Sequence, residues 1–219
     1  VIYLKLMIED KVKNFFSGYA ADFDSIYGDG KKRNTFSKFF DKNFRSAMFG
    51  RYKKTIDFIE KNNVSSVLDI GCGSGIYMQT LNAKGVEVSG IDLSEEMIKM
   101  TKDRLMNKNL NYSELIVGGY LDYKFKKKYE VSILMGFFDY IEKPEIVLEK
   151  TLNDSSKNVL ASFPKKGGLL YIQRKIRYWL RNCPLYFYSE KRLHAILKTL
   201  GKEYSIIDND REFFVIINS

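Results

Sequence analysis

A glycine-rich turn between a predicted strand and a predicted helix constrains the fold of this chain more than any other feature. Residues 64–70 are mostly β-branched and apolar, which is typical of a buried strand. A helix is expected to run from the turn to Leu81. Glycines permit a tight turn and a close approach of a ligand to the backbone, and the helix start supplies unpaired N–H groups. The turn consists of Gly71, Cys72, Gly73, Ser74 and Gly75.

Strands and helices alternate along the rest of the chain. The patterns predict further strands at 86–91, 115–118, 131–136, 158–163, 204–207 and 212–217, with helices at 94–107, 145–152 and 189–200. Alternation implies a parallel sheet with helices on both faces, whereas the short turn before the last strand makes the final pair antiparallel. The predicted fold class is therefore α/β: a Rossmann-like, doubly wound, mostly parallel seven-stranded sheet with an antiparallel final strand.

The residues before the first strand are expected to form a helical cap. Aromatic and apolar residues recur at roughly helical spacing over 8–30, and a second helix is predicted at about 42–61. We therefore divide the chain into an N-terminal helical segment at 1–63 and a core at 64–219. An aromatic and basic insertion at 165–188 separates the fifth strand from the last helix.

The net charge of +9 leaves several partners open. A basic chain can meet nucleic acid, an anionic membrane surface or an acidic small molecule, or it can simply be rich in lysine. Because the charge is spread along the sequence, it argues against nucleic acid. A single histidine and no carboxylate cluster at ligand spacing predict that no metal is bound.

The two cysteines and the first eight residues indicate in which cellular compartment we expect the protein. Cys72 and Cys183 lie far apart, with neither disulfide nor zinc spacing, and a thiol inside the glycine turn suits a reducing compartment. The apolar run at 1–8 is too short for a membrane span and lacks the layout of a signal peptide. We expect a cytoplasmic protein.

Asp92 narrows the chemistry of the glycine turn. It stands at the end of the second strand, where an acidic residue can accept both ribose hydroxyls of an adenosine. Residues 67–75 (VLDIGCGSG) and 88–97 (VSGIDLSEEM) resemble the first two motifs of the class I S-adenosylmethionine-dependent methyltransferases. A dinucleotide-binding turn requires a further glycine at the position where this chain has Ile76. Asp69 also suits a ligand with an ammonium group better than one with two phosphates.

The resemblance implies that S-adenosylmethionine is the cofactor. Asp69 and the glycine turn would surround its methionine part, and Asp92 would take the ribose. The family often has an acidic residue after the third strand, where this chain has glycine and where Asp122 could substitute. Other residues that the resemblance places near the adenine or the end of the fourth strand are Leu93, Met97, Gly119, Tyr120 and Met135.

Tyr19, Tyr27 and Arg51 precede the core. In similar small-molecule enzymes, N-terminal aromatic residues and an arginine close over the methionine carboxylate. The alternatives are packing for the two tyrosines and a solvated charge for the arginine. The stretch 135–141 (MGFFDYI) is also similar to small-molecule methyltransferases and lacks the Pro-Pro and Pro-Cys signatures of nucleic-acid enzymes.

Three side chains are candidates for a general base. Asp139 follows the fourth strand on the carboxyl edge of the sheet, where substrates of open α/β folds bind, but it could instead cap a helix or lie in a loop. Tyr140 is its neighbour. His194 is the only histidine and sits beside the apolar stripe of its helix, so a structural role is the alternative. A base is optional, since amines, phenolates and carboxylates accept a methyl group with little help.

Together these features predict an S-adenosylmethionine-dependent methyltransferase that acts on a small-molecule acceptor, by O- or N-methylation. The alternatives are an RNA or protein methyltransferase that uses the basic surface, and a non-catalytic module that binds the cofactor. In 165–188, Leu169, Ile172, Ile176 and Trp179 mark an apolar face, while Arg174, Lys175, Arg177 and Arg181 add charge. We expect a substrate cover for an acidic or aromatic acceptor, with membrane-surface contact and plain packing as alternatives.

Overall fold

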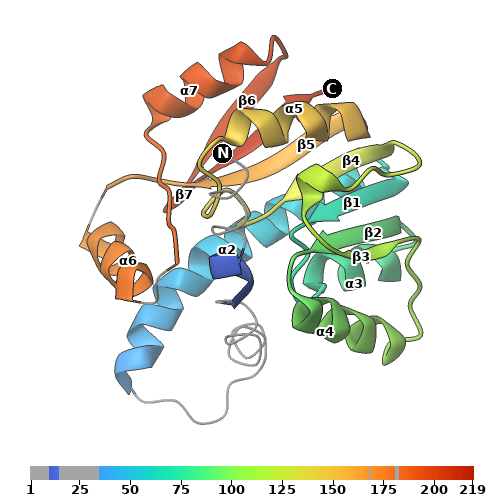
Figure 1. Ribbon diagram of the computed structural model, residues 1–219, viewed down its shortest axis with the longest axis horizontal. Coiled ribbons are helices and arrows are strands. Elements are labelled where there is room, and N and C mark those ends of the chain that lie inside the picture. The colour runs from blue at the N-terminus through green and yellow to red at the C-terminus, as the bar shows by residue number, and fades with distance from the viewer. Residues whose placement is uncertain (1–9, 15–34, 168, 181–182) are drawn as a thin grey trace.

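Seven strands form a single sheet in the order β3-β2-β1-β4-β5-β7-β6 (Figure 1). The computed structural model describes residues 10–14, 35–167, 169–180 and 183–219. Strands β1 to β5 are parallel, and β7 is antiparallel to both of its neighbours, β5 and β6. The predicted fold class is confirmed. The strands are β1 Ser66–Ile70, β2 Glu87–Asp92, β3 Leu115–Val117, β4 Tyr129–Leu134, β5 Ser155–Pro164, β6 Tyr204–Asn209 and β7 Glu212–Asn218.

Helices cover both faces of the sheet, since α2, α3 and α4 pack on one face while α5 and α7 pack on the other. No helix in the described part of the chain is both long and apolar enough to cross a membrane. The helices are α2 Thr35–Lys61, α3 Ile76–Ala83, α4 Glu95–Met106, the 3-10 turn η1 Tyr120–Asp122, α5 Pro144–Asp154, α6 Leu169–Leu180 and α7 Glu190–Thr199.

Local sequence signals explain where several helices begin. Ser94 accepts a hydrogen bond from the Met97 N–H at 3.2 Å, which caps α4, and Ser189 caps α7 in the same way. Pro144 opens α5, where its missing N–H costs nothing. Helix α2 begins at Thr35, earlier than the sequence indicated. Residues 10–14 are helical, and the rest of the segment predicted at 8–30 lies almost wholly outside the described residues.

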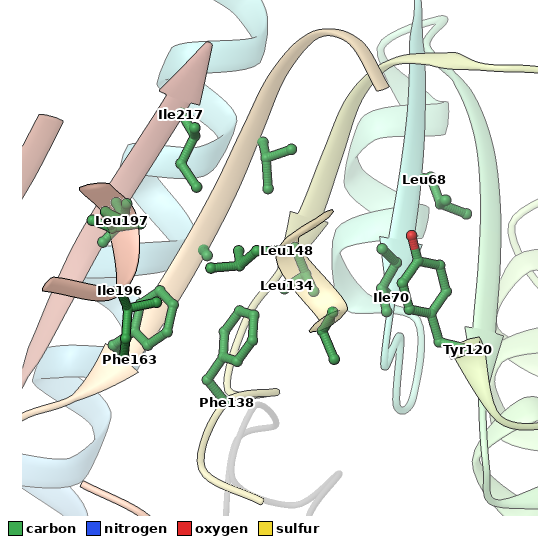
Figure 2. Close-up of a cluster of buried hydrophobic side chains, with 14 of the residues drawn as sticks. Leu68, Ile70, Tyr120, Leu134, Phe138, Leu148, Phe163, Ile196, Leu197 and Ile217 are labelled. Carbon is green, nitrogen blue, oxygen red and sulfur yellow. The ribbon is translucent and has the colours of Figure 1, made fainter. Parts of the chain in front are cut away.

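Alternation along the strands builds two apolar layers. Leu68 and Ile70 of β1 face the α5 and α7 side, whereas Val67 faces α2 and α3. Figure 2 shows the first layer, with Phe138 and Phe163 close to one another at its lower side. Their rings are stacked, with centroids 4.3 Å apart. These rings lie beside the carboxyl ends of β4 and β5, so the core extends fully buried up to that edge.

A buried polar network fastens α2 to the hairpin of β6 and β7. The Arg51 Nη1 lies 3.0 Å from the Glu212 Oε2, and both side chains are about nine-tenths buried. Asn209 donates to the other Glu212 oxygen and accepts from Lys54 Nζ at 2.8 Å. Burial raises the pKa of Glu212, and the Arg51 charge opposes this shift. Since Glu212 pairs with Pro164 at the end of β5, α2 crosses the sheet at its carboxyl edge.

Loss of the stacked aromatic pair should lower the stability of the whole core. We expect Phe163→Ala to reduce the free energy of unfolding by about 3–5 kcal/mol, because the ring is fully buried and would leave a cavity. Phe49→Ala is the control, since Phe49 is 53% exposed on α2 and should change stability by about 0.5 kcal/mol at most. Urea titrations measure both values, and equal losses in the two variants would contradict the assignment of the core.

Candidate functional site

The three glycines of the turn after β1 all adopt left-handed backbone conformations. Their φ angles are 73° at Gly71, 53° at Gly73 and 75° at Gly75, a region that other residues rarely enter. A Cβ atom at Gly71 would lie 2.8 Å from the Phe137 ring, and one at Gly75 would lie 2.5 Å from Thr101. A Cβ atom at Gly73 would meet nothing within 4 Å. The turn is therefore packed from behind and open at its middle residue.

Helix α4 supports the turn through two side chains that the sequence analysis missed. Thr101 Oγ1 donates to the Gly73 carbonyl at 2.7 Å, and Arg104 Nε donates to the Ser74 carbonyl at 2.6 Å. With Met97 they follow a spacing of four and three residues, which places them on one face of the helix. That spacing is visible in the sequence, but only the parallel packing of α3 and α4 tells which helix face meets the turn.

The Asp92 carboxylate joins the turn to the start of α4. Its Oδ2 accepts the Gly73 N–H and its Oδ1 accepts the Ser94 N–H, both at 2.9 Å. Ser94, not Asp92, is the cap of α4. Each carboxylate oxygen has a second acceptor direction, so ribose hydroxyls can be bound without breaking either bond. Nearby, Leu93 is half-buried and Met97 is fully buried.

Asp69 is a buried carboxyl group with an unsatisfied oxygen. Its side chain is 2% exposed, and Oδ2 has no hydrogen-bond partner among the described residues. Burial raises its pKa from 3.8 to about 8, and the nearby Asp92 charge adds to the shift. The Ser74 hydroxyl, also buried, has no partner in the described part of the chain either. A ligand that brings a cation and a hydrogen-bonding group would satisfy both side chains, and the ammonium and carboxylate of a methionine moiety fit this requirement.

Cys72 fills the back of the turn. Its Sγ would lie 3.0 Å from a Cβ atom at Gly90, so β2 needs glycine there. Burial, together with the charges of Asp92 and Asp69, raises the thiol pKa well above its usual value. Cys72 is therefore a packed, protonated thiol and not a nucleophile.

Arg51 lies beside Gly136, just beyond the carboxyl end of β4, the strand that pairs with β1. A Cβ atom at Gly136 would come within 3.1 Å of its guanidinium, and Gly136 itself has a φ of 76°. Because Arg51 is buried and paired with Glu212, the alternative of a solvated charge is wrong. Met135 is also buried here and accepts a weak bond from Thr55 at 3.7 Å. Tyr19 and Tyr27 lie outside the described residues.

A second buried ion pair lies just beyond β4. Arg174 Nη2, from α6, is 2.7 Å from Asp139 Oδ2, and the Asp139 backbone carbonyl accepts the Tyr186 N–H. Asp139 therefore does not cap a helix. Arg174 Nε is buried with no hydrogen-bond partner among the described residues. The rings of Tyr178 and Phe187 lie 5.6 and 5.9 Å from its guanidinium carbon. This arrangement offers one cationic donor within an aromatic surround.

Tyr140, His194 and Tyr120 take positions that differ from the sequence expectations. The Tyr140 hydroxyl is 3.3 Å from that of Tyr178, and burial raises its pKa well above 10, so it stays protonated. His194 bonds to Tyr204 at the opposite, amino edge of the sheet, so the structure does not bring it to the site. The Tyr120 side chain points into the core and donates to Asp154 at 2.7 Å (Figure 2).

After β3, glycine stands where the acidic residue was expected, so Gly119 can offer a cofactor only backbone atoms. Gly119 precedes η1, and its carbonyl accepts the Asp122 N–H. Asp122 is exposed, beyond the end of β3. Among the described residues, no three His, Cys, Asp or Glu side chains come together as a metal site requires, and the absence of a metal requirement stays a prediction.

Comparisons with known proteins agree with this geometry. The family model described as a methyltransferase domain matches residues 67–157. A ubiquinone biosynthesis O-methyltransferase of Nitrosomonas europaea is 30% identical over 139 residues, which are 63% of this chain and 53% of that protein. An uncharacterized methyltransferase of Alkaliphilus oremlandii is 26% identical over 150 residues, which are 64% of this chain and 67% of that protein. The chain spans about half the length of the ubiquinone biosynthesis O-methyltransferases it matches.

Among solved structures, the magnesium protoporphyrin IX methyltransferase from Synechocystis PCC 6803 with bound SAH is similar along nearly the whole chain. The TM-score is 0.78 at 19% sequence identity, and the match covers 96% of this chain and 99% of that one. At this identity the likeness shows the fold. The chain therefore has the fold of this methyltransferase, and its residues 67–157 match the methyltransferase domain. The part that matches the family model runs from β1 to the start of β5.

Asp92→Ala should weaken the cofactor about tenfold or more. Hydrogen bonds to a charged group contribute on the order of 1.5–3 kcal/mol each, and two ribose hydroxyls would lose theirs. Calorimetry with S-adenosylhomocysteine measures the change. Glu95→Ala is the matched control, because Glu95 is an exposed acidic residue only three positions away. An unchanged affinity in Asp92→Ala would show that this carboxylate serves only the two backbone bonds.

The raised pKa of Asp69 should make cofactor affinity depend on pH. Binding an ammonium requires the carboxylate, which the cofactor-free protein forms only near a pH of about 8. We expect the affinity for S-adenosylhomocysteine to rise by about tenfold per pH unit from about pH 6 towards that value. Asp69→Asn should bind more weakly and with a flat profile. A flat profile in the unsubstituted protein would contradict the role of Asp69.

The same carboxyl group should make the cofactor-free protein less stable in alkaline solution. Because its pKa is higher folded than unfolded, its favourable contribution is complete below about pH 4 and is lost as the pH rises through about 8. Asp69→Asn removes this loss, so its Tm should fall less between pH 5 and pH 9. Parallel Tm profiles for both proteins would be the contrary outcome.

Proposed function

We propose that this chain is an enzyme that transfers a methyl group from S-adenosylmethionine to a small-molecule acceptor. The observation that carries the proposal is the pairing of two carboxylates with an open glycine turn at the carboxyl ends of β1 and β2. When bound, the cofactor supplies an activated methyl group on a sulfonium, and transfer is an in-line displacement that depends mainly on positioning.

In this proposal the chain's own residues hold the cofactor in two halves. Asp69 pairs with the ammonium of the methionine part, while the open backbone at Gly73 lets that part approach. Asp92 accepts the ribose hydroxyls, and Leu93 and the backbone at Gly119 border the adenine. Arg51, held by Glu212 beside the end of β4, is close enough to the turn to attract the methionine carboxylate.

The acceptor is proposed to bind between the end of β4 and α6. Arg174 presents a buried, unsatisfied Nε there, and Tyr178 and Phe187 flank its guanidinium. Such a cationic group between aromatic rings suits an acceptor with a flat, apolar body and an acidic group. Two of the similar proteins named above have small molecules in their names, ubiquinone and magnesium protoporphyrin IX, which supports an acceptor of this size.

Asp139 is proposed to position Arg174 and to serve as a base only when the acceptor needs one. Its carboxylate is already paired with the guanidinium, and Tyr140 stays protonated, so neither residue is a strong base here. An acceptor that is itself a carboxylate, phenolate or amine needs little proton removal. This favours such acceptors over simple alcohols.

We propose a cytoplasmic location because the thiols of both cysteines are free. Cys72 and Cys183 are both buried and unpaired. Cys72 lies inside the cofactor turn, where a disulfide would displace the backbone that Asp92 holds.

The test of the acceptor site starts with a screen of aromatic and anionic metabolites against methyl-labelled S-adenosylmethionine. For the acceptor that is found, Arg174→Gln should raise KM about tenfold or more and leave cofactor affinity unchanged, because a charged hydrogen bond of on the order of 1.5–3 kcal/mol is lost. Lys175→Gln is the control, since Lys175 is the next residue on α6 but is exposed. Equal effects of both variants, or loss of cofactor binding in Arg174→Gln, would contradict this acceptor site. No transfer to any acceptor would contradict the enzyme itself.

A further inference from the structure

Helix α6 presents an apolar stripe to solvent and a polar-aromatic face to the protein. Four large side chains point outward, with exposed fractions of 53% for Ile172, 53% for Ile176, 76% for Trp179 and 71% for Leu180. The inward side carries Arg174, bonded to Asp139, and Tyr178, which is 7% exposed. The packing of an apolar face against the core, one alternative from the sequence, is therefore wrong for this helix.

The positions of the outward residues form one continuous face. At 100° per residue, Ile172, Ile176, Trp179 and Leu180 fall within an arc of about 100°. The inward residues Tyr171, Arg174 and Tyr178 occupy the opposite arc. Figure 1 shows α6 apart from the seven-stranded sheet, so none of the strands in the described part of the chain covers this face. Four neighbouring exposed apolar side chains, one of them a tryptophan, are characteristic of a surface that meets another apolar phase.

We propose that this face of α6 docks on an anionic lipid membrane, lying in the plane of the headgroups. A helix with a strongly segregated apolar face and basic flanks binds such an interface. Lys175 borders the stripe and is exposed, and Lys166 is exposed just before the helix. The net charge of the chain is +9, which attracts an anionic surface.

Charge also separates the lipid surface from a second copy of this chain. A second copy would bring the same lysines and the same net charge to the contact, so electrostatic repulsion would oppose the apolar gain. An anionic bilayer supplies opposite charge around an apolar interior, which matches both parts of the face. Trp179, at one edge of the stripe, is the residue type that prefers the boundary between headgroups and chains.

Docking by this face would place the proposed acceptor site behind α6, on the side of the helix that faces away from the lipid. The inward residue Arg174 lies on the face of α6 opposite Ile176. A flat, apolar acceptor that partitions into lipid would therefore be concentrated about one helix diameter from the residues proposed to bind it. Docking on the membrane does not require methyl transfer, so it can be tested independently of the proposed function.

Trp179 is the only tryptophan of the chain, so its fluorescence reports directly on the proposed face. With the full chain and vesicles of phosphatidylcholine and phosphatidylglycerol, we expect a blue shift of the emission and sedimentation of the protein with the vesicles. Pure phosphatidylcholine vesicles should bind less, and added salt should weaken binding to the anionic ones. Brominated lipids should quench the emission.

Substitutions on the stripe should weaken vesicle binding selectively. We expect Ile176→Gln with Leu180→Gln to lower the partition coefficient about tenfold or more, because two aliphatic side chains no longer enter the lipid. Matched controls are Met106→Gln on α4 and Ile146→Gln on α5, which remove apolar side chains of 70% and 51% exposure away from α6. All variants should keep the Tm and the S-adenosylhomocysteine affinity of the unsubstituted protein.

Three results would overturn the proposal. The first is an emission maximum that does not change with anionic vesicles. The second is an equal loss of vesicle binding in the control variants, which would place the contact elsewhere. The third is a blue shift that follows protein concentration in the absence of lipid, with a dimer in sedimentation equilibrium, because the face would then pair with a second copy.

Discussion

The Asp92 carboxylate holds two turns of the backbone together, and the geometry of the cofactor site depends on it. By accepting the N–H groups of Gly73 and Ser94, it fixes the glycine turn relative to the start of α4. Helix α4 also holds the glycine turn through Thr101, which donates a hydrogen bond to the Gly73 carbonyl. The middle of the turn is thus held by hydrogen bonds to its own backbone groups. Its outer side stays open because Gly73 has no side chain.

Two buried ion pairs lie at the carboxyl edge of the sheet, near the end of β4. Arg51 with Glu212 fastens the cap helix α2, and Arg174 with Asp139 fastens α6. Buried pairs add little net stability, but they fix geometry, since either charge alone would be costly. The regions proposed to bind the cofactor and the acceptor are therefore bounded by elements that are far apart in the sequence yet meet at the same edge of the sheet.

The elements that could be predicted from the sequence are those set by local patterns. The β1 strand, its glycine turn and the position of Asp92 depend on short-range spacing, and the alternation of strands and helices fixes the sheet class. The orientation of α6, by contrast, depends on contacts with residues that are distant in the sequence. Periodicity shows that the helix has two faces, but not that Arg174 and Tyr178 face inward while Trp179 faces out. His194 was misplaced for the same reason, since its partner Tyr204 is set by the register of the final hairpin.

The contact between Arg51 and Glu212 spans 161 residues of sequence. On a ribosome, α2 is made long before β7, so the Arg51–Glu212 contact can form only after the parallel strands have been made, although α2 can already pack on that part of the sheet. Closing so large a loop is slow, which makes this contact a late event in folding. The edge of the sheet that binds the cofactor is consequently finished last, and a nascent chain that has not yet exposed β7 has a sheet but no completed site.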